Sequence, residues 1–141
     1  MKLTSVYPVL MARDVAAAAA FYRDVLGFET TFEADWYVSL RQGLWELALL
    51  DPDHPTIPEG FRGSPAGGVL LNLEVADVDT VYQDLTARGV EVALPLRSED
   101  FGQRHFIVRG PDGVLIDVIT PIPPQGEYVE QFADAATPVD G

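Results

Sequence analysis

The side chains that could perform chemistry are few in this chain of 141 residues. It contains no cysteine, so disulfides, thiolate nucleophiles and cysteine metal sites are excluded. Its two histidines are His54, in a stretch rich in proline and glycine, and His105, at the start of a predicted strand. Histidines in such places are most often surface or partly packed residues, and we interpret both in this way.

Aromatic side chains are the second group, because a ring can stack on a planar ligand. Phe101 lies in the polar segment 98–102, where it has no obvious core to join, so it is either exposed for a reason or packed over the rim of a sheet. Trp36 and Tyr37 begin a predicted strand, and alternation puts one of them on each face. By the same rule Trp45 is expected to pack in the core.

Composition and net charge limit the classes of molecule that this chain is expected to bind. Apolar residues make up 48% and charged residues 22% of the chain, which is an ordinary globular composition. The net charge of −13 repels phosphate backbones and anionic lipids, so nucleic acid is not an expected partner. The first residues lack the plan of a signal peptide, and no apolar run approaches the roughly 18 to 20 residues that span a bilayer. We therefore expect a cytoplasmic protein without membrane contact.

The elements that must position these side chains form a repeat. A strand at residues 5–11 precedes a helix at 15–26, for which Asp14 is a favoured N-cap and Gly27 a favoured residue after the last turn. Three further strands are predicted at residues 28–34, 36–41 and 44–50.

The second half repeats this order. A strand at residues 69–75 precedes a helix that Asp77 caps and Gly89 ends, with apolar residues on one face at positions 78, 81, 82 and 85. Three strands are predicted at residues 90–96, 105–109 and 114–120. We therefore expect a first β-α-β-β-β module at residues 1–50, a linker at 51–68, a second module at 69–120 and a tail at 121–141, together one structural domain. A short helix is expected around residues 128–132.

Three motifs carry a resemblance to a known family. They are Arg-Asp-Val at residues 13–15, Phe-Tyr-Arg-Asp-Val-Leu-Gly-Phe-Glu at 21–29, and Gly-Pro-Asp-Gly at 110–113. With the repeat, this chain resembles the vicinal oxygen chelate superfamily of glyoxalases, extradiol dioxygenases, and bleomycin and fosfomycin resistance proteins. The resemblance covers about residues 5–120. It implies an α+β fold in which two βαβββ modules form a concave, curled sheet around a ligand cleft.

The resemblance also implies where a metal would be held. Metal-dependent members of the superfamily have ligands at the positions of Tyr7, Glu46, Leu70 and Asp117. Leu70 has no donor atom, a neutral tyrosine is a poor ligand at pH 7, and two carboxylates alone hold a divalent cation weakly. We therefore predict no metal and no other cofactor, as in the metal-free binders that resemble bleomycin resistance proteins.

In the implied fold, strand alternation places Leu70, Asn72 and Asp117 on the cleft face. Glu46 and Asp117 could act there as an acid/base pair, a clamp for a cationic group or a weak metal site, or they could be two carboxylates that never meet. Phe101 stands where bleomycin resistance proteins place a ring that stacks on the ligand. The predicted ligand-binding residues are Tyr7, Trp36, Glu46, Leu70, Asn72, Phe101 and Asp117.

The leading functional hypothesis is metal-independent binding of a small hydrophobic or aromatic molecule, of the bacterial antibiotic-sequestering resistance type. The alternative is an isomerase or lyase of the same superfamily that uses Glu46 or Asp117 as acid/base. A third possibility is a protein-interaction module that uses the linker or the tail. Because members of the superfamily usually build their clefts as dimers, we expect a homodimer.

Overall fold

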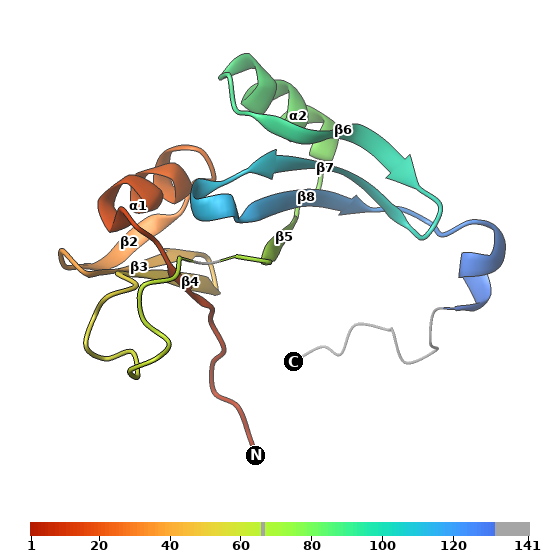
Figure 1. The fold of residues 1–141 in the computed structure, drawn as a ribbon. Coiled ribbons are helices and arrows are strands. Elements are labelled where there is room, and N and C mark those ends of the chain that lie inside the picture. The colour runs from red at the N-terminus through yellow and green to blue at the C-terminus, as the bar shows by residue number, and fades with distance from the viewer. Residues whose placement is uncertain (66, 132–141) are drawn as a thin grey trace. The chain divides into compact units, whose positions relative to one another are not determined.

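The computed structural model describes residues 1–65 and 67–131 and divides the chain into two compact units (Figure 1). The first unit comprises Met1–Val69 and Gly110–Val114, and the second comprises Leu70–Arg109 and Leu115–Gly141. Each unit has one four-stranded sheet, in the order β1-β4-β3-β2 or β5-β8-β7-β6. The α+β class and the repeated β-α-β-β-β order predicted from the sequence are therefore confirmed.

The elements of the first unit lie close to their predicted positions. They are β1 (Val9–Met11), α1 (Val15–Asp24), β2 (Glu29–Glu33), β3 (Tyr37–Gln42) and β4 (Trp45–Leu50). The first strand is shorter than predicted, because its parallel pairing with β4 begins only at Val9. Pro8, just before it, has no N–H group for a sheet and contributes only its carbonyl, which accepts from the backbone N–H of Ala48.

Helix α1 forms where its capping residues predict. The side chain of Asp14 accepts a hydrogen bond from the backbone N–H of Ala17 at 2.9 Å. At the other end Gly27 adopts a φ of 79°, a conformation that glycine takes without strain. The helix packs on β3 and β4, as Figure 1 shows. The buried side chains of this layer include Ala18, Tyr22, Val38, Leu40 and Leu49.

The prediction that Trp45 packs in the core is wrong. Trp45 is 75% exposed, whereas Leu47 and Leu49, further along the same face of β4, are buried. Trp45 is the first residue of β4, next to the turn at Gly43, and pairs with Gln42 at the end of the hairpin. Alternation assigns the face of a strand residue, but burial also needs a neighbour that covers the strand at that point.

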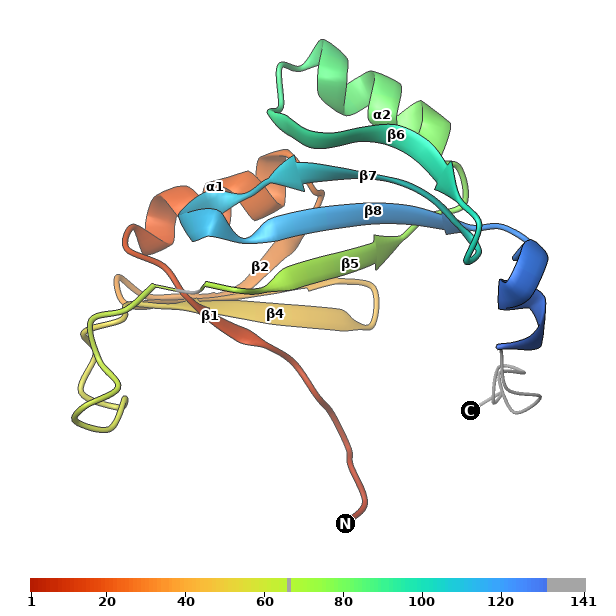
Figure 2. The ribbon, with the colours of Figure 1, turned by 45° about the vertical axis from the view of Figure 1, so that its right-hand side comes forward.

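The second unit repeats the arrangement, and Figure 2 shows β5 running beside β8. Its elements are β5 (Leu70–Glu74), α2 (Val78–Ala87), β6 (Val92–Glu99), β7 (Gln103–Arg109), β8 (Leu115–Pro121) and a 3-10 helix, η2 (Gly126–Glu130). The 3-10 helix lies where a short helix was predicted around residues 128–132, although residue 132 is outside the described part of the chain. The β6–β7 turn holds only residues 100–102, because both strands extend further than predicted.

Helix α2 is tied to β8 by hydrogen bonds. The side chain of Asp77 accepts from the hydroxyl and from the backbone N–H of Thr80, and these hydrogen bonds lower the pKa of the Asp77 carboxyl. The hydroxyl of Thr120 accepts from the N–H of Val78 and donates to the carbonyl of Val75. The core below the helix is centred on the buried ring of Phe106. No helix within residues 1–65 and 67–131 is long and apolar enough to cross a membrane.

Candidate functional site

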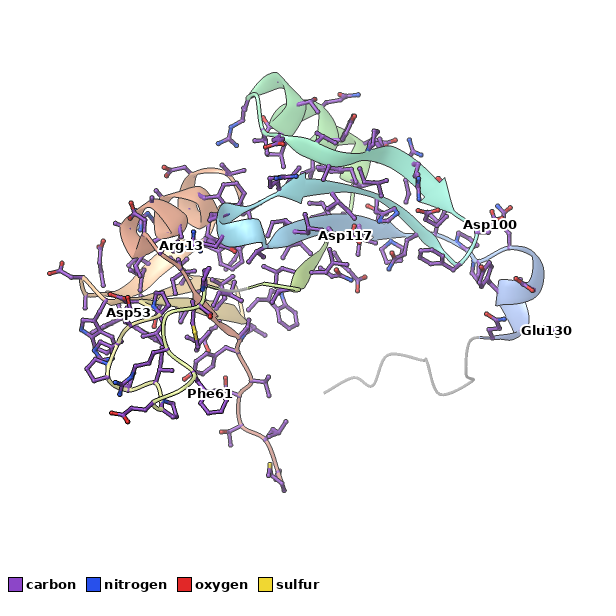
Figure 3. All side chains as sticks on the ribbon, in the orientation of Figure 1. Arg13, Asp53, Phe61, Asp100, Asp117 and Glu130 are labelled. Atoms are coloured by element: carbon purple, nitrogen blue, oxygen red, sulfur yellow. The ribbon has the colours of Figure 1, made fainter. Side chains whose placement is uncertain are left out.

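A buried histidine flanked by two carboxylates lies at the centre of the second unit. Nδ1 of His105 lies 2.8 Å from Oδ1 of Asp117, and its Nε2 lies 2.8 Å from Oε2 of Glu99. His105 is 5% exposed and Asp117 is 4% exposed, whereas Glu99 lies at the edge of the cluster. Figure 3 shows Asp117 midway along β8. The interpretation of His105 as a surface or partly packed residue is therefore wrong.

The strand register explains why these three residues meet. His105 on β7 pairs directly with Arg97 on β6 and with Ile119 on β8. Glu99 and Asp117 each lie two residues from those partners, at the diagonal positions that long side chains reach on the same face of a sheet. The cluster thus depends on both strand pairings at once.

The charges of this cluster are balanced internally. Both partners of the His105 ring are carboxylates, so the geometry favours the protonated imidazolium, which can donate from both ring nitrogens. Desolvation by burial is the largest single influence and lowers the pKa of His105, but the hydrogen bonds to Glu99 and Asp117 and their charges together raise it above its ordinary value. Glu99 also accepts from Nε of Arg97 at 2.7 Å. The hydrogen bonds from His105 and Arg97 lower the pKa of Glu99.

Phe101 lies beside this charge cluster. Its ring is 40% exposed and meets the His105 ring edge to face, with the centroids 6.4 Å apart. On another side it meets the ring of Tyr128, from η2, at 6.1 Å and in the same type of contact. The ring of Phe101 is thus half covered by two neighbours and half open to solvent.

Two further predicted residues share the sheet face of Asp117. Asn72 pairs directly with Asp117 across the β5–β8 ladder, and Leu70 pairs with Leu115 two positions earlier. Residues that pair directly, and residues two apart, point to the same side of a sheet. Leu70 is 50% exposed and Asn72 is also exposed. The structure therefore brings Leu70, Asn72 and Asp117 together on one face, as predicted.

The remaining predicted residues belong to the first unit. Tyr7 is exposed and precedes β1, and Glu46 is exposed on β4 opposite Arg41. Trp36 lies just before β3, and its ring stacks on His54 with the centroids 3.9 Å apart. Since Glu46 and Asp117 lie in different units, the expectation that they face each other stays a prediction.

The positions implied for a metal do not suit one. The side chain of Leu70 offers no lone pair, and Oδ1 of Asp117 already pairs with Nδ1 of His105. No group of three or more histidine, aspartate or glutamate side chains in the described part of the chain is arranged to hold a metal ion. The donor set therefore fails to fit a divalent transition metal, which needs several free nitrogen or oxygen ligands.

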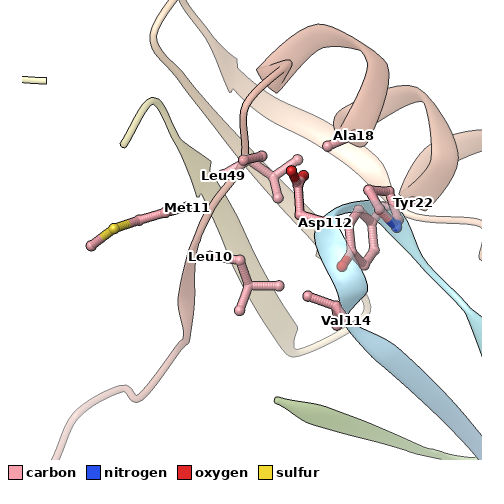
Figure 4. Close-up of a pocket in the computed structure, with 9 residues that line it drawn as sticks. Leu10, Met11, Ala18, Tyr22, Leu49, Asp112 and Val114 are labelled. Atoms are coloured by element: carbon pink, nitrogen blue, oxygen red, sulfur yellow. The ribbon is translucent and has the colours of Figure 1, made fainter. Parts of the chain in front are cut away.

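A shallow hollow in the first unit has a structural role (Figure 4). Its lining includes Leu10, Tyr22, Leu49, Asp112 and Val114, and it has no room for even a water molecule. Asp112 adopts a φ of 58° in the turn Pro111–Gly113, and its Oδ1 accepts from the backbone N–H of Arg13. Desolvation by burial, together with the charge of Asp112, raises the pKa of Tyr22 to about 12. The hollow therefore marks where β1, α1 and β4 pack against the turn Pro111–Gly113, and it is too small to hold a ligand.

Sequence reasoning missed four residues here: Arg97, Glu99 and His105 of the charge cluster, and Tyr128, which contacts Phe101. The segment around Glu99 was predicted as a loop, which hid its place on β6 and its register with β7. A hairpin turn at residues 100–102, with Gly102 as its flexible position, is the signal that could have revealed the pairing. Tyr128 had no signal beyond the short predicted helix that contains it.

Comparisons with known proteins agree with this fold. Residues 4–118 match the Glyoxalase/Bleomycin resistance protein/Dioxygenase superfamily. No curated protein matches the chain. A protein of unknown function from Agrobacterium tumefaciens str. C58 is 31% identical, with a TM-score of 0.71 over 86% of this chain and 97% of that one.

Two further solved structures are similar. Lactoylglutathione lyase from Agrobacterium tumefaciens is 25% identical, with a TM-score of 0.69 over 85% of this chain and 96% of that one. A glyoxalase/bleomycin resistance protein/dioxygenase from Nocardioides is 21% identical, with a TM-score of 0.73 over 90% of this chain and 89% of that one. The latter likeness concerns the fold alone.

Proposed function

Since the chain belongs to the Glyoxalase/Bleomycin resistance protein/Dioxygenase superfamily, we propose that it binds a small hydrophobic or aromatic molecule without a metal ion. The observation that carries this proposal is the pairing of His105 with Asp117 and Glu99. This pairing engages both nitrogens of His105, the histidine beside the predicted residues Phe101 and Asp117. It also engages an oxygen of the carboxylate that the resemblance places at a metal position.

Two large apolar side chains on the sheet and the β6–β7 turn of the second unit remain open to solvent, alongside polar ones such as Asn72. Leu70 and Phe101 are both substantially exposed, although neither is at a chain end. Exposed large apolar side chains are typical of ligand-binding or protein-binding surfaces. The register puts these two toward opposite ends of β8, because Gln103, next to the turn that carries Phe101, pairs with Pro121, whereas Leu70 pairs with Leu115. A flat or apolar ligand on Phe101 would bury its ring, at about 25 cal/mol per Å² of apolar area removed from water.

We further propose that this binding is of the antibiotic-sequestering resistance type. Sequestration requires only affinity and sufficient copies of the protein, so no group with free acid/base capacity is needed. The pairing of His105 with Glu99 and Asp117 is compatible with such a role, because these contacts hold the strands that flank the turn carrying Phe101.

An enzyme of the superfamily is the second candidate. The 25% identity to a lactoylglutathione lyase favours it, and the acid/base would be Glu46 or Asp117. Of these, Glu46 is exposed on β4, whereas Asp117 is buried against His105. An isomerase or lyase would therefore depend more on Glu46 than on Asp117.

The test is a fluorescence titration of the EDTA-treated protein with a panel of flat aromatic natural products and cofactors. Phe101→Ala is expected to weaken binding about tenfold, because a ring contact contributes roughly 0.5 to 1.5 kcal/mol beyond the area it buries. Phe61→Ala is the control, since Phe61 is an exposed ring of the same type in the first unit, 73% exposed against 40% for Phe101. Its affinity should equal that of the unmodified protein.

The same samples decide between binder and enzyme. Mass spectrometry of the compound recovered after incubation should show it unchanged. If the compound is converted, and Glu46→Gln abolishes the conversion, the binder proposal is wrong and the enzyme takes its place. If no panel member binds below about 100 µM, the binder proposal also fails.

A further inference from the structure

The chain after β8 returns over the β6–β7 turn and holds it in place. The backbone N–H of Ile122 donates to the carbonyl of Gly102 at 2.9 Å, and that of Gln125 donates to the carbonyl of Asp100 at 2.8 Å. These bonds fix the turn on both sides of Phe101. We call residues 122–131 the C-terminal arm, and Figure 3 shows it through its labelled residue Glu130, next to the turn that carries Asp100.

The arm also fixes the ring of Phe101. Tyr128 contacts it edge to face at 6.1 Å with an interplanar angle of 77°, and His105 contacts it at 6.4 Å with an angle of 74°. A ring held by a fixed backbone and two perpendicular neighbours loses little further freedom when a ligand stacks on its open part. Such preorganisation increases affinity, because less conformational entropy is lost on binding.

The side chains of Arg97, Glu99, His105 and Asp117 form the floor beside this ring, and the floor carries no uncompensated charge. The negative charges of Asp117 and Glu99 are matched by the positive charges of His105 and Arg97, all joined through hydrogen bonds. The nearby carboxylates of Asp100, Glu127 and Glu130 are exposed, where salt screens them. A cationic ligand therefore gains little from the charge cluster. Whatever field the exposed carboxylates keep after screening attracts a cationic ligand weakly and repels an anionic one weakly.

We propose that the C-terminal arm is one wall of the ligand site, that Tyr128 positions Phe101, and that the site takes an uncharged planar aromatic group. This inference rests on the proposed function and deepens it. It replaces the cationic clamp of Glu46 and Asp117 considered from the sequence, because Asp117 is already paired with His105.

The experiment is an NMR titration of the whole protein, with amide shifts of Gly102 and Tyr128 as the signal. The probes share one ring system and differ in charge: 2-naphthalenemethanol, 2-naphthylmethylamine and 2-naphthoate. At 0.5 M NaCl the uncharged probe should bind at least as tightly as the cationic one, and the anionic probe least tightly. An advantage of the cationic probe above fivefold at this salt concentration would overturn the proposed ligand class.

Variants of the arm test the role of Tyr128. Tyr128→Ala should weaken binding of 2-naphthalenemethanol about threefold to tenfold, whereas Tyr128→Phe keeps the ring and should bind normally. Val129→Ala, at an exposed neighbour in η2, is the matched control and should have no effect. A positioning role also predicts that cross-relaxation between the Phe101 and His105 rings weakens in Tyr128→Ala and persists in the other two variants.

The possible outcomes separate this inference from the proposed function. If Phe101→Ala weakens binding while Tyr128→Ala leaves both affinity and ring cross-relaxation unchanged, the role of the arm is wrong and the binder proposal stands. If members of the wider panel bind but 2-naphthalenemethanol does not, the ligand class is wrong. If no planar aromatic binds at all, the proposed function itself fails.

Discussion

Oδ1 of Asp117 lies 2.8 Å from Nδ1 of His105, although 12 residues separate them along the chain. Both side chains are buried, and the second ring nitrogen of His105 is held by Glu99. A buried charge is costly unless it is paired, so each member of this pair requires the other. The pairing fixes the turn beside it and removes Asp117 from the set of free carboxylates.

Replacing Asp117 tests the energetic importance of this pair. Asp117→Asn keeps the shape but removes the charge, and we expect it to lower the free energy of unfolding by about 1.5 to 3 kcal/mol, the range for a hydrogen bond to a charged group. Urea denaturation measures the change. Glu46→Gln is the matched control, because it makes the same change at an exposed carboxylate and should stay within about 0.5 kcal/mol. A loss below about 0.5 kcal/mol for Asp117→Asn would contradict the account.

The same cluster predicts how stability depends on pH. The pKa of His105 is raised, so its contribution is complete below its ordinary value of 6.5 and is lost as the pH rises through the higher value in the folded protein. The pKa of Glu99 is lowered, so its contribution is complete above 4.5 and is lost as the pH falls through the lower folded value. The cluster therefore stabilises the fold most between about pH 4.5 and 6.5.

Urea midpoints measured from pH 4 to 9 check this dependence. His105→Gln should remove the loss of stability that the unmodified protein shows as the pH rises from about 6.5 through the higher folded pKa of His105. His54→Gln, which changes the histidine stacked on Trp36, should retain that loss. Equal alkaline slopes for the unmodified protein and His105→Gln would show that His105 does not titrate as described.

Several features of the fold could be predicted from the sequence because their causes are local. Asp14 and Asp77 cap helices through their own side chains, and Gly27 ends α1 with a positive φ. These effects act within one or two turns of the chain, so no knowledge of distant partners is needed. The repeat of such local signals at matching spacing was enough to predict two modules.

The charge cluster could not be predicted in the same way. His105 meets Glu99 and Asp117 only through diagonal positions on two neighbouring strands, so the contact depends on the register of both pairings. That register depends on the β6–β7 turn, which holds only residues 100–102 and is shorter than the predicted connection between residues 96 and 105. The prediction that Trp45 is buried was wrong for a related reason. Its exposure depends on what covers the end of the β3–β4 hairpin, which strand alternation does not reveal.

Replacing Asp112 tests the contact between the turn Pro111–Gly113 and the backbone of Arg13 in the first unit. Asp112→Ala removes the carboxylate that accepts from the N–H of Arg13. It also leaves a residue with no polar side chain at a φ of 58°, where only a side chain that can form local hydrogen bonds is well tolerated. We expect a loss of about 1 to 2 kcal/mol in urea denaturation. Asp112→Asn keeps an acceptor and a polar side chain and should cost less than half as much. The pKa of Tyr22 is about 12 in the unmodified protein. Ultraviolet titration of Asp112→Ala should give a lower value, which stays above 10 because the ring is still buried.

We propose that the protein is a homodimer. Strand β2 is an edge strand whose residues are all exposed, and Trp45 and Phe61 are large apolar side chains open to solvent. Light scattering at micromolar concentration should give twice the chain mass of 15.4 kDa. Trp45→Ser should shift the mass toward the monomer if this residue lies in the contact. A mass of one chain for the unmodified protein would contradict the proposal.

Binding before and after chelation tests the central claim, that this chain holds its ligand without a metal, most directly. The protein is dialysed against EDTA and titrated calorimetrically with the tightest panel ligand, then titrated again after one equivalent of Zn, Ni, Mn or Fe is added. Because Leu70 has no donor atom and Asp117 is paired with His105, we expect the dissociation constants to agree within about twofold. Binding that disappears on chelation and returns with one of these metals, but not in Glu46→Gln, would contradict the account.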